Sequence, residues 1–170
     1  MRVDSASFRK ALGQFASGVT VVTTRDRSGR EHGLTVSAFC SVSLRPPLVL
    51  VCIDHRSEAN AGVRESGLFA VSVLAEGQED VSRRFAAHGR AKVADFPFLQ
   101  GKRGLPLVPG ALAHLECRVR SSHDEGDHAV WVGEVRALSV RPGRPLLHHS
   151  GAYGRFAAAG RTGKADGDRL

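Results

Sequence analysis

The sequence predicts a mainly β protein, an α+β chain folded as an antiparallel barrel with helices on its outside. Short β-branched or alternating segments recur along the chain, polar turns join several of them as hairpins, and only two or three segments have helical periodicity. With 170 residues, 42% of them apolar, the chain can bury the core of one ordinary domain. We expect this domain to span residues 1–156.

The first element is predicted to be a helix. Asp4 and Ser5 are candidate N-caps, and Gly18 is a candidate stop. The apolar residues between them recur at helical spacing: Phe8, Ala11, Leu12 and Phe15.

Strands follow this helix. Residues 19–24 and 32–39 flank the polar turn 26–30, so they form a predicted hairpin. The residues Leu44-Arg45-Pro46-Pro47 break any regular element. The continuous apolar run 48–53 is typical of a strand covered on both faces.

The second half alternates helices and strands before a final hairpin. Ser57 is a candidate N-cap with Glu58 in the first turn, and Gly67 is a candidate stop. The other predicted elements are, in chain order, a strand at 69–74, a helix at 78–88, a long irregular loop at 90–110, a strand around 115–119, a turn at 124–127 and a strand at 129–140. The tail 157–170 has the composition of a disordered segment.

Charge and composition argue against several classes of partner. The chain has 24 Lys and Arg against 17 Asp and Glu, a net charge of +7, but its arginines are scattered and no aromatic residues interleave with them, which disfavours nucleic-acid binding. No apolar run is long enough for a membrane span, and Asp4 stands where a signal peptide would be apolar. The cysteines Cys40, Cys52 and Cys117 lack CxxC spacing and are expected to be reduced and mostly buried. We therefore expect a cytoplasmic protein, and no motif predicts a metal site.

Three segments have residue types suited to chemistry. In residues 33–43, hydroxyls alternate with apolar residues, a pattern suited to hydrogen-bonding a planar, heteroatom-rich ring or a phosphate, and equally to a strand face in contact with water; its polar members are Thr35, Ser37, Ser41 and Ser43. Arg56 and Ser57 stand at a predicted helix start, where unpaired N–H groups favour anions, although a plain N-cap beside a solvated arginine has the same pattern. His128 follows the turn Gly126-Asp127 and either faces a cleft or is a surface histidine.

The segments LTVSAFCSVSLRPPLVLVCIDHRS, LFAVSVLAEGQEDVSRRFA, LECRV, GDHAVWVGEV and PLLHHSGAYGRF occur in this order and together resemble the short-chain flavin reductase family. Members of this family are the reductase components of two-component flavin-dependent monooxygenases. The resemblance runs from Phe8 to Phe156. It implies a Greek-key, FMN-binding split β-barrel, a homodimer, and reduction of free FMN or FAD by NADH or NADPH.

The resemblance also implies roles for particular residues. The flavin ring would lie against Thr35, Ser37, Ala38, Ser41 and Ser43. Its phosphate side would lie against Asp54, Arg56, Ser57 and Asn60. His128 would hold the nicotinamide as the catalytic residue, and Tyr153 would close the site.

The implied partners are the flavin and nicotinamide nucleotides and a monooxygenase that receives reduced flavin. Position 36 is Val and position 40 is Cys where the family often has small polar residues, so the choice between FMN and FAD stays open. Two alternatives use the same barrel: a non-catalytic flavin-binding or storage protein, and an oxidase of different chemistry.

Overall fold

The structure, a computed structural model, describes residues 2–158, with only the backbone described at Arg90. The tail expected at 157–170 therefore lies almost entirely outside the described residues. None of the helices in the described part of the chain is long and apolar enough to cross a membrane.

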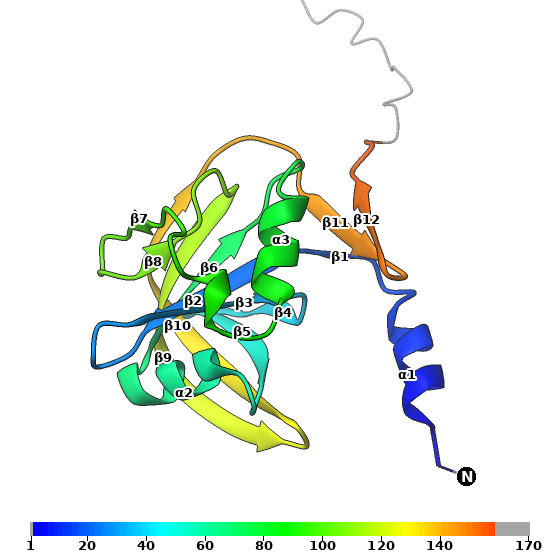
Figure 1. Ribbon diagram of the computed structural model, residues 1–170, viewed down its shortest axis with the longest axis horizontal. Coiled ribbons are helices and arrows are strands. Elements are labelled where there is room, and N and C mark those ends of the chain that lie inside the picture. The colour runs from blue at the N-terminus through cyan, green and yellow to red at the C-terminus, as the bar shows by residue number, and fades with distance from the viewer. Residues whose placement is uncertain (1, 159–170) are drawn as a thin grey trace, which may run out of the picture.

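A seven-stranded antiparallel sheet forms the body of the molecule (Figure 1). It contains, in sheet order, β3 (Glu31–Val36), β2 (Thr20–Arg25), β6 (Leu68–Val73), β9 (Ala113–Glu125), β10 (His128–Val140), β5 (Pro47–Asp54) and β4 (Phe39–Leu44). The two edge strands, β3 and β4, are neighbours in the sequence, joined only by Ser37 and Ala38. Two linking residues span about 10 Å at most, so the sheet must curl round until its edges approach each other. The result is a barrel that is split between β3 and β4, with peripheral helices, as predicted.

The core fills the inside of this curled sheet. Alternate residues of β5, β10 and β6 point inward and are fully or almost fully buried, among them Val51, Ile53, Trp131 and Phe69. The Phe69 ring packs directly against the backbone of β10 at Gly133, because a Cβ at this glycine would stand 2.4 Å from the ring. Residues of β5 alternate between buried and half-buried, so one face of the predicted strand is fully covered and the other face is covered only in part.

The described residues contain three α-helices, α1 (Ser5–Leu12), α2 (Glu58–Ser66) and α3 (Glu79–Ala86). Of these, α2 and α3 pack on the barrel and α1 stands away from it (Figure 1). Ser57 caps α2 by accepting a hydrogen bond from the Ala59 N–H, and Gly67 ends the helix at φ 69°, both as predicted. Helix α1 begins at its predicted cap Asp4 but ends before Gly13, well short of Gly18, so Phe15 lies beyond it.

Short strands complete the fold. A three-stranded sheet of β1 (Ser17–Gly18), β11 (Leu146–His149) and β12 (Ala152–Arg155) stands beside α1 at one side of the barrel (Figure 1). The predicted loop 90–110 contains a 3-10 turn at η1 (Arg90–Lys92) and a small hairpin of β7 (Leu99–Gln100) and β8 (Pro106–Leu107). Strands β1, β4, β11 and β12 were not predicted, because each is short or interrupted by polar residues.

The cysteines differ from the expectation. Only Cys117 is buried, while Cys52 is half-buried and Cys40 is exposed on the edge strand β4. Burial raises the pKa of the Cys117 thiol to about 12. The expectation of mostly buried thiols was therefore wrong, because an edge strand of a curled sheet leaves part of its surface open.

Candidate flavin-binding site

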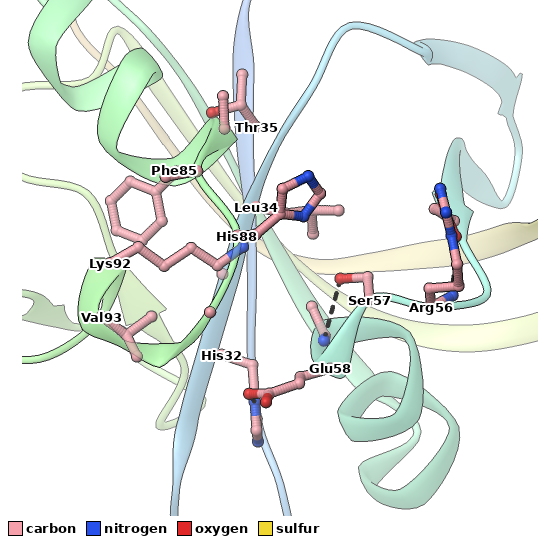
Figure 2. A pocket seen from close by; sticks show the side chains of 16 residues that line it. His32, Leu34, Thr35, Arg56, Ser57, Glu58, Phe85, His88, Lys92 and Val93 are labelled. Carbon is pink, nitrogen blue, oxygen red and sulfur yellow. Dashed lines mark hydrogen bonds and ion pairs between the residues drawn. The ribbon is translucent and has the colours of Figure 1, made fainter.

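A cavity of about 390 Å³ lies where β3, the start of α2 and the end of α3 meet (Figure 2). On one side stand Arg56, Ser57 and Glu58, and on the other the α3–η1 segment with Phe85 and His88. The β3 residues between them form the floor: His32, Gly33, Leu34 and Thr35. The volume is in the range of pockets that hold small organic ligands.

The α2 side of the cavity is suited to anions. Ser57 caps the helix, so the first backbone N–H groups of α2 open toward this end, where the helix dipole favours negative charge. Asp54, the last residue of β5, accepts hydrogen bonds from the Arg56 backbone N–H at 2.8 Å and from Arg56 Nη2 at 2.7 Å. These bonds hold the pKa of Asp54 well below its usual range, so its carboxylate stays ionised.

The α3 side combines apolar surface with positive charge. The rings of Phe85, Phe96 and Phe98 pack together, and Phe85 and Val93 present apolar surface to the cavity. Burial lowers the pKa of Lys92, and the charge of Glu58 opposes this change. An apolar wall facing a cationic and N–H-rich wall suits a flat aromatic ring that carries a phosphate.

Glycine 33 allows α3 to come this close to the sheet. A Cβ at this position would stand 2.8 Å from Cε1 of Phe85, which is fully buried. Thr35 then fastens the helix, because its hydroxyl donates to the Ser82 carbonyl at 2.7 Å. Strand β3 therefore lines the cavity and is also the surface on which α3 packs.

Four of the predicted site residues line this cavity: Thr35, Asp54, Arg56 and Ser57. Ser37 and Ala38 form the exposed link between the edge strands, and the Ala38 carbonyl accepts from the Cys52 N–H at 3.1 Å, beside the strand end that leads into Asp54. Ser41 and Ser43 lie further along β4, outside the cavity lining. The alternating hydroxyl residues of segment 33–43 are thus divided between two edge strands and the link that joins them.

His128 begins β10 and is the register partner of Asp54 in β5. The structure therefore brings together two segments that are more than seventy residues apart in sequence. His128 Nδ1 lies 2.6 Å from Asp127 Oδ1, and this hydrogen bond lowers the pKa of Asp127. His128 is half-buried at the rim beside the cavity rather than in its lining.

Asn60 and Tyr153 lie outside the cavity lining. Asn60 is only 5% exposed, and its Oδ1 accepts from the Trp131 indole N–H at 2.8 Å, which places it in the core and not on the cavity surface. The Tyr153 hydroxyl lies 2.8 Å from Ser82 Oγ, and Arg83 stacks over the Tyr153 ring. Tyr153 therefore contacts α3 at Ser82, the same residue whose carbonyl accepts from Thr35.

The sequence interpretation missed the α3–η1 wall, namely Phe85 as a cavity residue together with His88, Lys92 and Val93. Its one relevant signal was the length of the Pro- and Gly-rich segment 90–110, which is typical of functional or covering loops. No local motif marked the individual residues, because they approach β3 only through packing of the helix.

Comparison with known proteins identifies the family. Residues 12–157 match the flavin reductase like domain, so the chain belongs to this family. It is 46% identical over 155 residues to an NADH-dependent flavin reductase from a Rhodococcus species, covering 90% of this chain and 87% of the relative.

Two further relatives show the range of the family. The chain is 42% identical over 152 residues to HsaB, the reductase subunit of a flavin-dependent monooxygenase from Rhodococcus jostii, with 89% and 77% of the two chains covered. Among solved structures, the Streptomyces globisporus NADH:FAD oxidoreductase SgcE6, in complex with NAD and FAD fragments, matches with a TM-score of 0.85 and 38% identity, covering 91% of this chain and 94% of that one.

Proposed function

We propose that this protein is an NADH-dependent flavin reductase that reduces free FMN or FAD and supplies the reduced flavin to a partner monooxygenase. The observation that carries the proposal is the meeting of three elements at one end of the barrel. The start of α2, the hydroxyl-bearing split between β3 and β4, and His128 on β10, which pairs with β5, lie together there. The curated relatives named above support the same activity.

In this proposal, the phosphate side of the flavin is held by the start of α2. Arg56 contributes a guanidinium and Ser57 a capped helix end, while Asp54 orients Arg56. The ring lies along the split, against Thr35, Ser37 and Ala38, with Ser41 and Ser43 further along β4. The residues present fit a flavin, because a flavin combines an aromatic ring system with a phosphate-bearing chain and the cavity has walls of both kinds.

NADH supplies the hydride and the flavin accepts it, so the protein contributes binding and orientation. His128 is proposed as the catalytic residue that holds the nicotinamide. Its Nδ1–H donates to Asp127, which leaves Nε2 as the ring nitrogen available to a ligand. Asn60 and Tyr153 act as positioning residues, Asn60 through Trp131 and Tyr153 through Ser82.

The site is open, which suits a flavin that must leave after reduction. Ser37, Ala38 and Ser41 are exposed, and the Arg56 side chain is 85% exposed. Binding groups that remain in contact with water give modest affinity. This openness is consistent with delivery of reduced flavin to a second enzyme.

We also propose that the protein is a homodimer that works in the cytoplasm, where reduced nicotinamide nucleotides are produced. Support for the dimer comes from α1. Among the described residues nothing buries this helix, and Phe8 and Leu12 are 55% and 58% exposed. An eight-residue helix is not stable alone in water, so its apolar face needs a partner surface.

The test is anaerobic stopped-flow absorbance of the oxidised flavin band, with FMN, FAD and riboflavin mixed in turn with NADH or NADPH. Fast, saturable bleaching with NADH is the expected result. Tight flavin binding without bleaching by either nucleotide would contradict the proposal and favour a flavin-storage protein.

A further inference from the structure

The Asp54 carboxylate occupies the hydrogen-bond donors at the anion-binding end of the cavity. Asp54 Oδ1 accepts from the Arg56 backbone N–H at 2.8 Å and from Arg56 Nε at 3.1 Å, and Oδ2 accepts from Nη2 at 2.7 Å. One edge of the guanidinium is thus fully engaged by an internal carboxylate. Both residues line the cavity.

These donors are the ones that a bound phosphate would use. A guanidinium fork and a backbone N–H at the entrance to a helix form a general site for oxyanions, and a carboxylate is chemically the same kind of acceptor as a phosphate. The Arg56 side chain is 85% exposed, so its geometry is held by Asp54 rather than by packing. Asp54 therefore stands where the phosphate of a ligand would bind.

From this geometry we infer that Asp54 competes with the flavin phosphate for Arg56 and so limits the affinity of the protein for phosphorylated flavins. The inference rests on the proposed function and deepens it. Phosphate binding has to loosen the Asp54–Arg56 pair or share the guanidinium with it. Asp54 is then a residue that favours release of the flavin, as a reductase that delivers its product needs.

Competition through Arg56 differs from simple charge repulsion. Two other carboxylates are near this end of the cavity: Glu58 in the first turn of α2, and Asp127 in the turn beside His128. The carboxylate hydrogen-bonded to the Arg56 guanidinium is that of Asp54. If Asp54 acts by competition, its effect on phosphate binding depends on Arg56, whereas repulsion through space does not.

The experiment measures equilibrium dissociation constants of FMN and riboflavin by flavin fluorescence at fixed ionic strength. The variants are Asp54→Asn, Arg56→Ala and the double variant. Asparagine keeps an oxygen that accepts from the Arg56 N–H and removes only the charge, and Asp54→Ser serves as a second variant if Asp54→Asn folds poorly. Asp124→Asn is the matched control, because Asp124 is an exposed carboxylate paired with Arg64 at 3.0 Å and lies outside the cavity lining.

Asp54→Asn is expected to tighten FMN binding about fivefold, the scale of one exposed ion pair, and to leave riboflavin binding unchanged. Arg56→Ala should weaken FMN binding but not riboflavin binding. In the Arg56→Ala background, Asp54→Asn should give no further tightening. Asp124→Asn should have no effect on either ligand.

Weaker or unchanged FMN binding in Asp54→Asn overturns the inference, as does equal tightening in the Arg56→Ala background. In these cases, a loss of FMN affinity in Arg56→Ala would still support the proposal that Arg56 binds the flavin phosphate. If Arg56→Ala affects FMN and riboflavin alike, the phosphate binds elsewhere, and both the inference and the assignment of Arg56 fail. The reductase activity is judged separately by the stopped-flow experiment.

Discussion

At the scale of single residues, the site depends on hydrogen bonds between side chains of neighbouring strands and turns. His128 is oriented by Asp127 and stands opposite Asp54, which orients Arg56. Each of these side chains is at least partly exposed, so the contacts contribute little to stability. Their effect is to set which donor or acceptor faces the cavity.

Replacement of His128 by alanine should raise the KM for NADH or lower kcat by about tenfold or more, because the nicotinamide loses its positioning contact. Flavin affinity should change much less. Steady-state kinetics and flavin titration measure the two effects separately. His123→Ala, on the neighbouring strand β9, is a control for histidine removal, and unchanged kinetics in His128→Ala would contradict the nicotinamide assignment.

Asn60 presents a different case, since its side chain is almost fully buried. Asn60→Ala removes the acceptor of the Trp131 indole N–H and leaves a buried donor unpaired, which should destabilise the protein by about 1–3 kcal/mol. Trp131 is the only tryptophan, so its fluorescence during urea unfolding gives the measurement. In a Trp131→Phe background, followed by circular dichroism, the cost of Asn60→Ala should shrink. An equal cost in both backgrounds would show that the hydrogen bond is not the cause.

At the scale of elements, α3 is the wall of the site that depends most on its neighbours. Phe85 packs on Gly33, Thr35 donates to the Ser82 carbonyl, and the Tyr153 hydroxyl meets Ser82 Oγ. A helix fixed at these points presents its carboxyl end to the cavity in one position. The shape of the cavity is therefore a property of how α3 packs on β3.

Gly33→Ala should disturb this packing, because the new methyl group would overlap the buried Phe85 ring, which is itself held by Phe96 and Phe98. Overpacking of this kind costs about 1–3 kcal/mol, and we also expect weaker flavin binding. Thermal unfolding and flavin titration test both effects. Gly18→Ala is the matched control, since a Cβ at Gly18 meets nothing within 4 Å. Similar results for the two variants would contradict the packing argument.

We expect the stability of the folded protein to depend on pH through Asp26, in the turn between β2 and β3. Hydrogen bonds from Ser28 and His32 hold the pKa of Asp26 well below its ordinary value of 3.8. A carboxylate whose pKa is lowered in the folded state contributes stability above its ordinary pKa and loses that contribution as the pH falls below it. The urea concentration at the unfolding midpoint should therefore decrease as the pH falls below about 3.8. This decrease should be less steep in Asp26→Asn. An identical slope in that variant would exclude Asp26 as a source.

At the scale of the whole molecule, α1 stands away from the barrel beside the β1–β11–β12 sheet, and this sheet packs on the barrel through Leu146 and Tyr153 (Figure 1). Within the described residues, its contact with the barrel runs partly through Glu76, which pairs with Arg144 and Arg155 at 2.6 and 3.1 Å. The apolar side chains of Phe8 and Leu12 in α1 are exposed, and Phe15, just beyond the helix, is 79% exposed. We propose that a second copy of the chain buries these apolar side chains in a dimer interface.

Leu12→Glu should therefore shift the protein from dimer to monomer in sedimentation equilibrium, because it places a charge in the proposed interface. Ala6→Glu adds the same charge on the far side of α1 and should leave the dimer intact. A wild-type protein that sediments as a monomer, or equal dissociation by the two variants, would contradict the interface.

Features that depend on a few adjacent residues could be predicted from the sequence. The cap at Ser57 and the stop at Gly67 follow from local backbone chemistry, as do the two hairpins around 26–30 and 124–127. The order of motifs along the chain also indicated the family, which the family match confirmed. Such features are determined by residues close together in the sequence, so they can be predicted without knowing which segments are in contact in the folded protein.

Only the tertiary structure decided which segments meet. The strand order places His128 opposite Asp54, the curl of the sheet brings the edges β3 and β4 together, and the packing of Phe85 on Gly33 turns α3 into a cavity wall. The same long-range contacts withdraw Asn60 into the core and leave Cys40 exposed. Such contacts join residues far apart in sequence, and strand order and packing, rather than local propensity, determine them.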